Sequence, residues 1–415
     1  MQAAAAPSAV DVAEVVLKHY EDELPRTGKP QPHETTVLAA FVLSTAKTVE
    51  EDAAACLSGS KRSKIGDAIH DSHAEVVARR ALVRWMLAHA RLALLGVESA
   101  VVVGGCIFVD TSEGGGERRL RLREGLGLHF FASEMPCGDA CVSASSGRRT
   151  GAKEVTTTEA PPEASEVESG EQATHRARRK PGRGEATLSM SCSDKIAKWL
   201  ILGVQGCLLS RWVDAVPIRT LTILLAESSG CRETLRGAQE SAQRAFWGRT
   251  RGFDRGSSPP RACTPPAIRV ISHRDAAGGI AEKLGLIIGA GSSSPSRASK
   301  SGVSINWSAL HYFEANRTFG PIHEVTLSAS GRKAGASKRL RTGEIFNSKV
   351  VSTISRYHTL RSFLDLLEEE HGSALGSMAY DDLKAGLGTD YYETWKRMKE
   401  DKGSIFSFWI AKRDG

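Results

Sequence analysis

Three short blocks of residues have the types and spacing that zinc-dependent hydrolysis requires. The first is Asp71-Ser72-His73-Ala74-Glu75, at the start of a predicted helix. Residues two apart on a helix project about 200° from each other, so His73 and Glu75 do not both ligate one ion. One side chain can bind the metal while the other reaches its water. Zinc lowers the pKa of that water, and a carboxylate can carry its protons to the ring nitrogen and the leaving amine of an amidine.

Such a site also needs further ligands, and cysteine is the candidate. Pro136-Cys137-Gly138 follows a predicted strand, and Pro before Cys is part of the deaminase signature H-x-E followed by P-C-x-x-C. The second cysteine of that signature is absent, because residue 140 is Ala. Cys141 is one residue late, and Cys192 in the block Met190 to Lys195 is the other candidate. Each motif alone is common, and the residues by themselves leave both cysteines open.

Alternating strands and helices are expected to position these blocks. Apolar periodicity predicts helices over 10–24, 72–94 and 193–209, and strands over 35–44, 101–108 and 126–132. This alternation favours an α/β core with helices covering a sheet. Residues 145–186 and 254–302 are rich in small and polar residues and are expected to be low-complexity inserts, with a short helix at 278–288. The apolar segment 405–410 should be buried.

The composition sets limits on the class of protein. The 415 residues are 41% hydrophobic and 25% charged, which is typical of a globular chain, and the formal net charge of +7 fits a polyanionic partner. The eight cysteines lack the dense spacing of a disulfide framework. No apolar run is long enough to span a bilayer, and residues 1–9 lack the basic region of a secretory signal. We therefore expect a soluble intracellular protein with no membrane partner.

Together the blocks resemble a known family. With Ala78-Arg79-Arg80 and the run Ser191 to Trp199, they resemble the deaminase domain of the adenosine deaminases acting on RNA. They resemble still more closely the tRNA-specific branch, which converts adenosine 37 of alanine tRNA to inosine. The resemblance extends from about Thr27 to Gly415 outside the two inserts. It implies His73, Cys137 and Cys192 as zinc ligands and Glu75 as the proton shuttle of a hydrolase.

The resemblance also implies the fold and its domains. It predicts a cytidine-deaminase-like three-layer α/β core, with a central mixed sheet, helices on both faces and a C-terminal region of helices and strands. Residues 1–26 are expected to form an N-terminal helical segment, and residues 27–415 a single deaminase domain that carries the inserts at 145–186 and 254–302.

The family buries inositol hexakisphosphate near the zinc, and this ligand needs many cations, which would repel one another at high cost if buried without it. The resemblance assigns the following residues to it: Arg79, Arg80, Lys195, Lys198, Trp199, Lys349, Tyr380, Lys384, Tyr392, Lys396, Trp409 and Lys412. Two positions depart from the pattern, since His70 stands where relatives often carry Asn and Ser189 where some carry Thr.

Several features favour tRNA as the partner. About 30 residues precede the deaminase-like region, fewer than a double-stranded-RNA-binding domain needs, and Cys141 replaces an Arg of the duplex editors. An anticodon-loop adenosine is already partly unstacked, so little base flipping is required. Lys61, Lys180 and Arg183 are candidate substrate contacts. Two alternatives stay open, namely adenosine-to-inosine editing of duplex or messenger RNA, and a non-catalytic RNA-binding relative.

Overall fold

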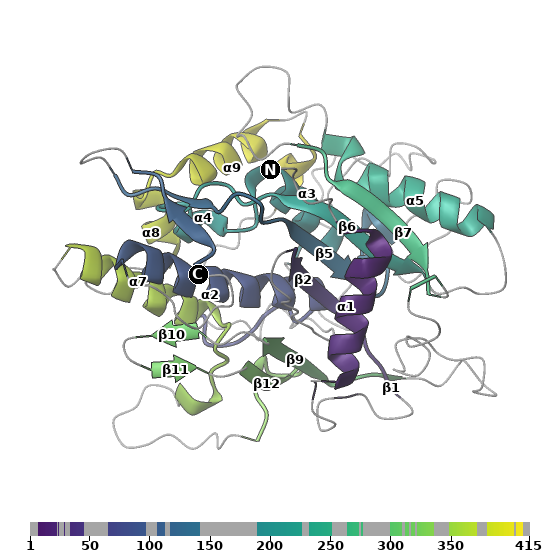
Figure 1. The fold of residues 1–415 in the computed structure, drawn as a ribbon, viewed down its shortest axis with the longest axis horizontal. Coiled ribbons are helices and arrows are strands. Elements are labelled where there is room, and N and C mark those ends of the chain that lie inside the picture. Colours follow the sequence, from purple (N-terminus) through teal and green to yellow (C-terminus); the bar gives the residue numbers. More distant parts are fainter. Residues whose placement is uncertain are drawn as a thin grey trace, which may run out of the picture.

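A four-stranded mixed sheet forms the centre of the structure (Figure 1). Its order is β2 (Ala39–Leu43), β5 (Leu128–Ala132), β6 (Ile218–Leu225) and β7 (Ala267–Ser272). Strand β2 runs antiparallel to β5, whereas β5, β6 and β7 are parallel. The computed structural model describes residues 7–22, 24, 29, 34–44, 65–96, 106–112, 117–141, 189–225, 232–250, 264–273, 275–276, 299–308, 312–314, 317–319, 322–335, 348–371, 380–401 and 404–409.

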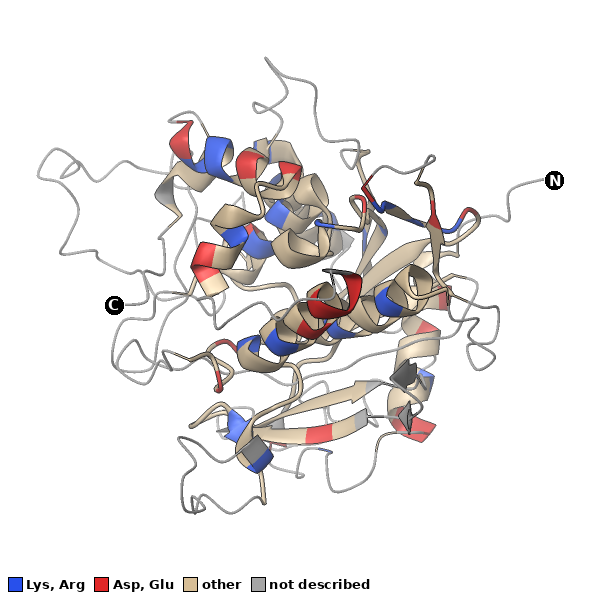
Figure 2. Cartoon of the chain, turned by 90° about the vertical axis from the view of Figure 1, so that its left-hand side faces the viewer, with Lys and Arg blue, Asp and Glu red and all other residues tan. Residues whose placement is uncertain are grey.

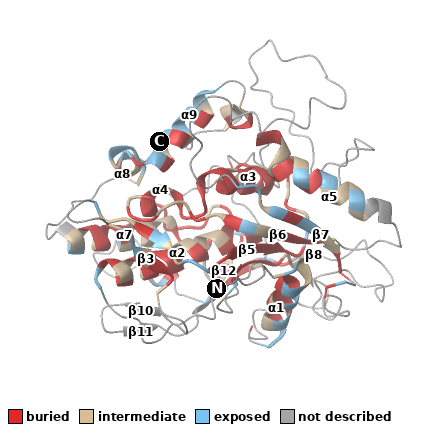
Figure 3. Cartoon of the chain, turned by 45° about the horizontal axis from the view of Figure 1, so that its top comes forward, coloured by how far each residue is buried: buried red, intermediate tan, exposed pale blue. Residues whose placement is uncertain are grey.

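Helices cover both faces of this sheet. All five residues of β2 are apolar and buried, as expected for a strand with a packed layer on each side. Phe41 points to the core that contains α2 (Ala74–Leu94), α3 (Cys192–Leu202) and α5 (Arg232–Phe246), whereas Val42 points to the core that contains α1 (Ala9–Asp22). Figure 3 shows the buried strands of the sheet between α3 and α1. The three-layer α/β fold expected from the sequence is confirmed.

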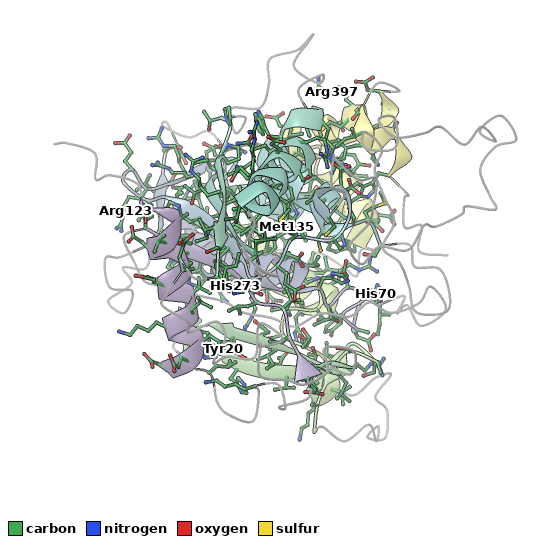
Figure 4. The ribbon with its side chains drawn as sticks, turned by 90° about the vertical axis from the view of Figure 1, so that its right-hand side faces the viewer. Tyr20, His70, Arg123, Met135, His273 and Arg397 are labelled. Atoms are coloured by element: carbon green, nitrogen blue, oxygen red, sulfur yellow. The ribbon has the colours of Figure 1, made fainter. Side chains whose placement is uncertain are left out.

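A second, antiparallel sheet lies against α1 and α2. Strand β12 (Ile322–Leu327) pairs with β9 (Val303–Ser308) on one side and β13 (Arg332–Lys333) on the other. Trp307 of β9 and Tyr20 of α1 belong to one apolar cluster, and Tyr20 lies at the end of α1 nearest this sheet (Figure 4). The remaining strands form short pairs, namely β1 (Glu34–Thr35) with β8 (Ser299–Lys300), β3 (Phe108–Asp110) with β4 (Leu120–Leu122), and β10 (Tyr312–Glu314) with β11 (Arg317–Phe319).

The C-terminal elements pack on the outer sides of α2 and α3. They comprise η6 (Ser348–Val350), α7 (Arg356–His371), α8 (Tyr380–Gly386), α9 (Asp390–Glu400) and the 3-10 helix η7 (Ile405–Phe408). Met398 of α9 and Phe406 of η7 join Ile201 of α3 in one apolar cluster. The predicted burial of the terminal apolar segment is therefore confirmed for Ile405 and Phe406. In the part of the chain that the structure describes, no helix has both the length and the apolar character needed to cross a membrane.

Two predictions about elements are wrong in part. The helix expected over 193–209 is two helices, α3 and α4 (Gly206–Leu209), because Gly203 ends α3 with a φ of +83°. The stretch 254–302 contains β7, whose Ile268 is buried in the sheet, so this part is not an insert. Its β-branched alternation is short and flanked by Pro and Ser, which concealed it. Residues 145–186, 278–288 and 101–105 lie outside the described residues.

Candidate zinc and catalytic site

Three side chains from distant parts of the chain meet beside the end of β5. His73 is the extended residue that precedes the first turn of α2, and Cys192 is the first residue of α3. Cys137 lies in the loop between β5 and the 3-10 helix η3 (Asp139–Cys141). In Figure 4, Met135 marks this loop and His70 marks the segment that leads to His73. Two helix N-termini therefore face the site, and their dipoles favour anionic groups such as thiolates there.

The spacing of the three side chains fits a zinc ion. The Nδ1 atom of His73 lies 3.7 Å from Cys137 Sγ and 3.6 Å from Cys192 Sγ. All three ligand atoms lie within 4.8 Å of one another. A tetrahedral zinc with ordinary Zn–S and Zn–N bonds places its nitrogen and sulfur ligands about 3.5 Å apart. Three protein ligands leave a fourth position for water, as catalytic zinc sites require.

Cys141, the alternative third ligand, has different contacts. Its thiol donates to the carbonyl oxygens of Met135 and Pro136, at 3.3 Å each. Within the described chain, the group of possible metal ligands comprises His73, Cys137 and Cys192 only. The choice of Cys192 therefore agrees with the geometry.

Backbone contacts hold the two cysteine segments together. The backbone N–H of Cys192 donates to Cys137 Sγ over 3.3 Å, and that of Ser193 donates to the Cys137 carbonyl over 3.0 Å. Gly138 makes this approach possible, because it has a φ of +108° and a Cβ there would lie 2.3 Å from Ser191 Oγ. Ser191 caps α3 through a bond from the backbone N–H of Asp194.

Glu75 lies in the first turn of α2, two residues after His73, and its side chain is buried. A carboxylate needs to be near the bound water, and away from the ligand positions, to act as a proton shuttle. The role of Glu75 as the proton shuttle stays a prediction, supported by its burial at the start of α2.

A buried ionic network lies behind His73. Asp71 accepts the backbone N–H of His73 over 3.2 Å and the hydroxyl of Ser189 over 2.6 Å. Lys195 of α3 forms an ion pair with the same carboxylate and donates to Ser189 over 2.8 Å. Because Asp71 bonds the zinc-site histidine and α3 at once, it fixes the start of α2 relative to α3. Lys195, which the resemblance assigned to the polyphosphate, has this carboxylate as its partner in the structure.

Comparison with known proteins identifies the family. A family model described as the adenosine-deaminase (editase) domain matches residues 54–413. The chain belongs to this family. This match confirms the enzyme class expected from the sequence, which is a hydrolytic adenosine deaminase.

Similar proteins within the editase family carry two kinds of name. A human protein named tRNA-specific adenosine deaminase 1 is 25% identical over 98% of this chain and 96% of its own length. A Drosophila melanogaster protein of the same name is 33% identical over 49% of this chain, which spans about half (51%) of that relative. A Drosophila protein named double-stranded RNA-specific editase Adar is 29% identical over 53% of this chain and 31% of its own length.

Basic and aromatic side chains of this editase domain contact one another between α2, α3 and the C-terminal helices. Figure 2 marks the Lys and Arg positions of these helices in blue. Lys198 Nζ lies 3.7 Å from the ring centroid of Trp395 and 5.4 Å from that of Trp409. Arg79 lies over Trp199, and its Nε donates to the Val204 carbonyl over 3.1 Å. We call this set of basic and aromatic residues the cation cluster; its members are Arg79, Arg80, Lys198, Trp199, Arg356, Tyr380, Lys384, Tyr391, Trp395, Lys399 and Trp409.

The charges of the cation cluster act on one another. Burial, followed by the charges of Arg79 and Lys384, lowers the pKa of Lys198 well below its ordinary value. Burial also lowers the pKa of Arg80, with Arg79 and Arg356 adding to this effect and Tyr380 and Asp71 opposing it. Mutual repulsion of buried cations is costly, so an anion bound among them would stabilise the structure.

Other residues assigned by the resemblance lie elsewhere. Lys349 is exposed on η6 and Lys396 is exposed on α9, where it lies close enough to lower the pKa of Lys399 slightly. The backbone N–H of Tyr392 donates to the Thr389 side chain, which caps α9. Lys61, Lys180, Arg183 and Lys412 lie outside the described residues.

Four members of the cation cluster were not predicted from the sequence. Tyr391, Trp395 and Lys399 follow each other at intervals of four on α9 and share one helix face, a periodic signal that could have revealed them. Arg356 begins α7 and lies 5.1 Å from the Tyr380 ring. Nothing in its local sequence distinguishes it from a surface arginine.

Proposed function

We propose that this editase-family protein uses zinc to deaminate adenosine to inosine in tRNA, at position 37 of alanine tRNA. The observation that carries the proposal is the group His73, Cys137 and Cys192, whose 3.6 and 3.7 Å separations match tetrahedral zinc. The names of the full-length relatives support tRNA as the substrate class, since the human relative aligns over 98% of this chain.

In this mechanism His73, Cys137 and Cys192 would hold the zinc. Zinc bound there would lower the pKa of a water molecule enough for attack at neutral pH. Glu75 accepts one proton of the water and passes it to the ring nitrogen N1 as the water oxygen bonds to C6 of adenosine. It then accepts the second proton from that oxygen and passes it to the amine, which leaves as the C6–N bond breaks. The buried position of Glu75 keeps bulk water from competing for these protons. The products are inosine and ammonia.

The network behind the site supports this chemistry by fixing geometry. Asp71 bonds the backbone of His73 and pairs with Lys195, so the backbone at His73 and the start of α3 keep one relative position. Partners of this kind orient metal ligands and tune their basicity.

We further propose that the cation cluster binds inositol hexakisphosphate. Its lysines and arginines are partly buried near one another, and burial and mutual repulsion lower the pKa of Lys198. A hexaphosphate would neutralise these charges, and the aromatic rings around Lys198 would exclude water from them. Phosphorus analysis of the denatured protein, followed by anion-exchange separation, tests this proposal, which a phosphate-free protein would contradict.

The function is tested by incubating zinc-loaded protein with alanine tRNA and with a long RNA duplex, then measuring inosine by mass spectrometry of the nucleosides. Inosine in the tRNA, lost when adenosine 37 is replaced by guanosine, is the expected result. Inosine in the duplex alone would point to duplex editing. Absence of inosine from both RNAs would point to a non-catalytic RNA-binding role. The Glu75→Ala variant should bind zinc and form no inosine.

A further inference from the structure

Each of the two zinc-site cysteines is followed, two residues later, by a fully buried aspartate. Asp139 follows Cys137 in η3, and Asp194 follows Cys192 in the first turn of α3. Both carboxylates have no exposed surface. Buried carboxylates need a cation or several hydrogen bonds to remain charged. Their partners therefore influence the two segments that carry the thiolates.

Both partners are arginines from the same part of the chain. Arg244, in the last turn of α5, lies 3.2 Å from Asp139 Oδ2 through its Nε and donates to the Asp139 carbonyl over 3.1 Å. Arg249, three residues after the end of α5, lies 2.7 Å from Asp194 Oδ1, and neither side chain is exposed. The planar guanidinium of Arg244 makes directional hydrogen bonds, and Arg249 forms a buried ion pair.

Helix α5 is itself fixed to the central sheet. The side-chain amide of Gln239 donates to the Ile268 carbonyl over 2.9 Å and accepts the backbone N–H of Val270 over 2.8 Å. These two groups belong to β7, the edge strand of the central sheet, whose outer side has no neighbouring strand among the described residues. Arg249 Nε also donates to the Ala245 carbonyl over 2.6 Å, which ties its side chain back to α5. The two arginines are therefore held by a helix that the sheet holds.

We propose that Arg244 and Arg249 are positioning residues of the metal centre. Through Asp139 and Asp194, they fix the segments of Cys137 and Cys192 at the separation that tetrahedral zinc requires. The inference rests on the proposed function, because it takes the cysteine pair as zinc ligands. It adds α5 as the element that connects the metal centre to the edge of the sheet.

The magnitude follows from the behaviour of residues that support metal ligands. Loss of such a partner typically weakens metal affinity 10- to 100-fold. Arg244 also bonds the backbone of η3, so its removal frees the segment that carries Cys137. A purely structural ion pair would lower stability and leave the zinc affinity of the folded protein unchanged.

The test compares Arg244→Gln and Arg244→Lys with Arg236→Gln, a matched control on the same helix whose side chain is 82% exposed and pairs with Glu240. Zinc affinity is measured by competition with a chromophoric chelator, ligand geometry by the visible absorption of the cobalt-substituted protein, and stability by melting of the metal-free protein. We expect Arg244→Gln to weaken zinc binding at least 10-fold and to shift the cobalt bands. Arg244→Lys should recover part of the affinity, and Arg236→Gln should match the wild type.

Further variants keep the test decisive. If the unpaired Asp139 prevents folding of Arg244→Gln, the double variant Arg244→Gln with Asp139→Asn removes the buried charge together with the contact, and we expect the same loss of affinity. Arg249→Lys should weaken zinc binding in the same way. Unchanged zinc affinity and cobalt spectra in folded Arg244 variants would overturn the inference, even if their melting temperatures fall. In that case a zinc-binding, inosine-forming wild type would leave the proposed function standing, whereas a wild type without zinc would overturn both.

Discussion

Replacement of Gly138 by alanine should damage the protein in two separable ways. Gly138 has a φ of +108°, and an added Cβ would lie 2.3 Å from Ser191 Oγ and 2.5 Å from Ser191 Cβ. The backbone conformation alone costs an alanine about 1–2 kcal/mol. Relief of the overlap requires Ser191 to move, which adds about 1–3 kcal/mol of overpacking.

The movement of Ser191 also has a local consequence. Its hydroxyl accepts from the Asp194 backbone and donates to the Asp194 carboxylate over 2.6 Å, so displacement weakens the cap of α3, at a cost of about 1 kcal/mol. We therefore expect the Gly138→Ala variant to lose about 3–6 kcal/mol of unfolding free energy. Because Cys137 and Cys192 flank the overlap, zinc affinity should fall as well.

Gly125 provides the control for the backbone contribution. It has a φ of +83°, and no atom lies within 4 Å of its added Cβ. Gly125→Ala should cost only about 1–2 kcal/mol and leave zinc binding unchanged. Urea denaturation of the metal-free variants, together with chelator competition, measures both quantities. Equal losses of stability in the two variants, with zinc affinity unchanged in Gly138→Ala, would refute the proposed packing of the cysteine segments.

Three further predictions concern acid, the network behind His73 and the metal. Burial, with Arg123 for His89 and Arg219 for His129, lowers the pKa of both imidazoles to about 4. The unfolded chain takes up these protons below about pH 6.5 and the folded chain does not. The unfolding free energy should therefore fall as the pH drops from 6.5 to 4, by about 3 kcal/mol for His89. Urea titrations in which a His89→Leu variant loses unfolding free energy as steeply with acid as the wild type would contradict this. Asp71→Asn should weaken zinc binding about 10-fold, because it removes the charge that pairs with Lys195, and an unchanged chelator-competition curve would exclude the role of this network. Treatment with a strong chelator should abolish inosine formation and stoichiometric zinc should restore it, whereas undiminished activity after verified zinc removal would rule out the metal mechanism.

Local patterns predicted the main elements of the fold well. The apolar spacing of α1 and α2 and the short apolar runs of β2 and β5 are visible within single windows of sequence, and all four elements are present near their expected positions. The single helix expected over 193–209 was wrong, because one residue with positive φ, Gly203, ends α3. Composition likewise concealed β7, because its six residues lie between Pro-rich and Ser-rich stretches.

The candidate site shows the same division between local and distant information. His73 and Glu75 are two residues apart, so one short window of sequence contains both, although His73 precedes α2 and does not lie in it. Cys192 lies 55 residues after Cys137, and only the family resemblance selected it over Cys141. The partners Arg244 and Arg249 cannot be recognised from sequence in this way, because their contacts depend on how α5 packs against the rest of the chain.

The most direct test of the account is the formation of inosine at adenosine 37 of alanine tRNA in a single turnover. Zinc-loaded wild-type protein, Cys192→Ala and Cys141→Ala are compared in the same assay, with each variant shown to be folded. The account predicts inosine from the wild type and from Cys141→Ala, and none from Cys192→Ala. Inosine formed by Cys192→Ala, or none formed by the zinc-loaded wild type, would contradict it.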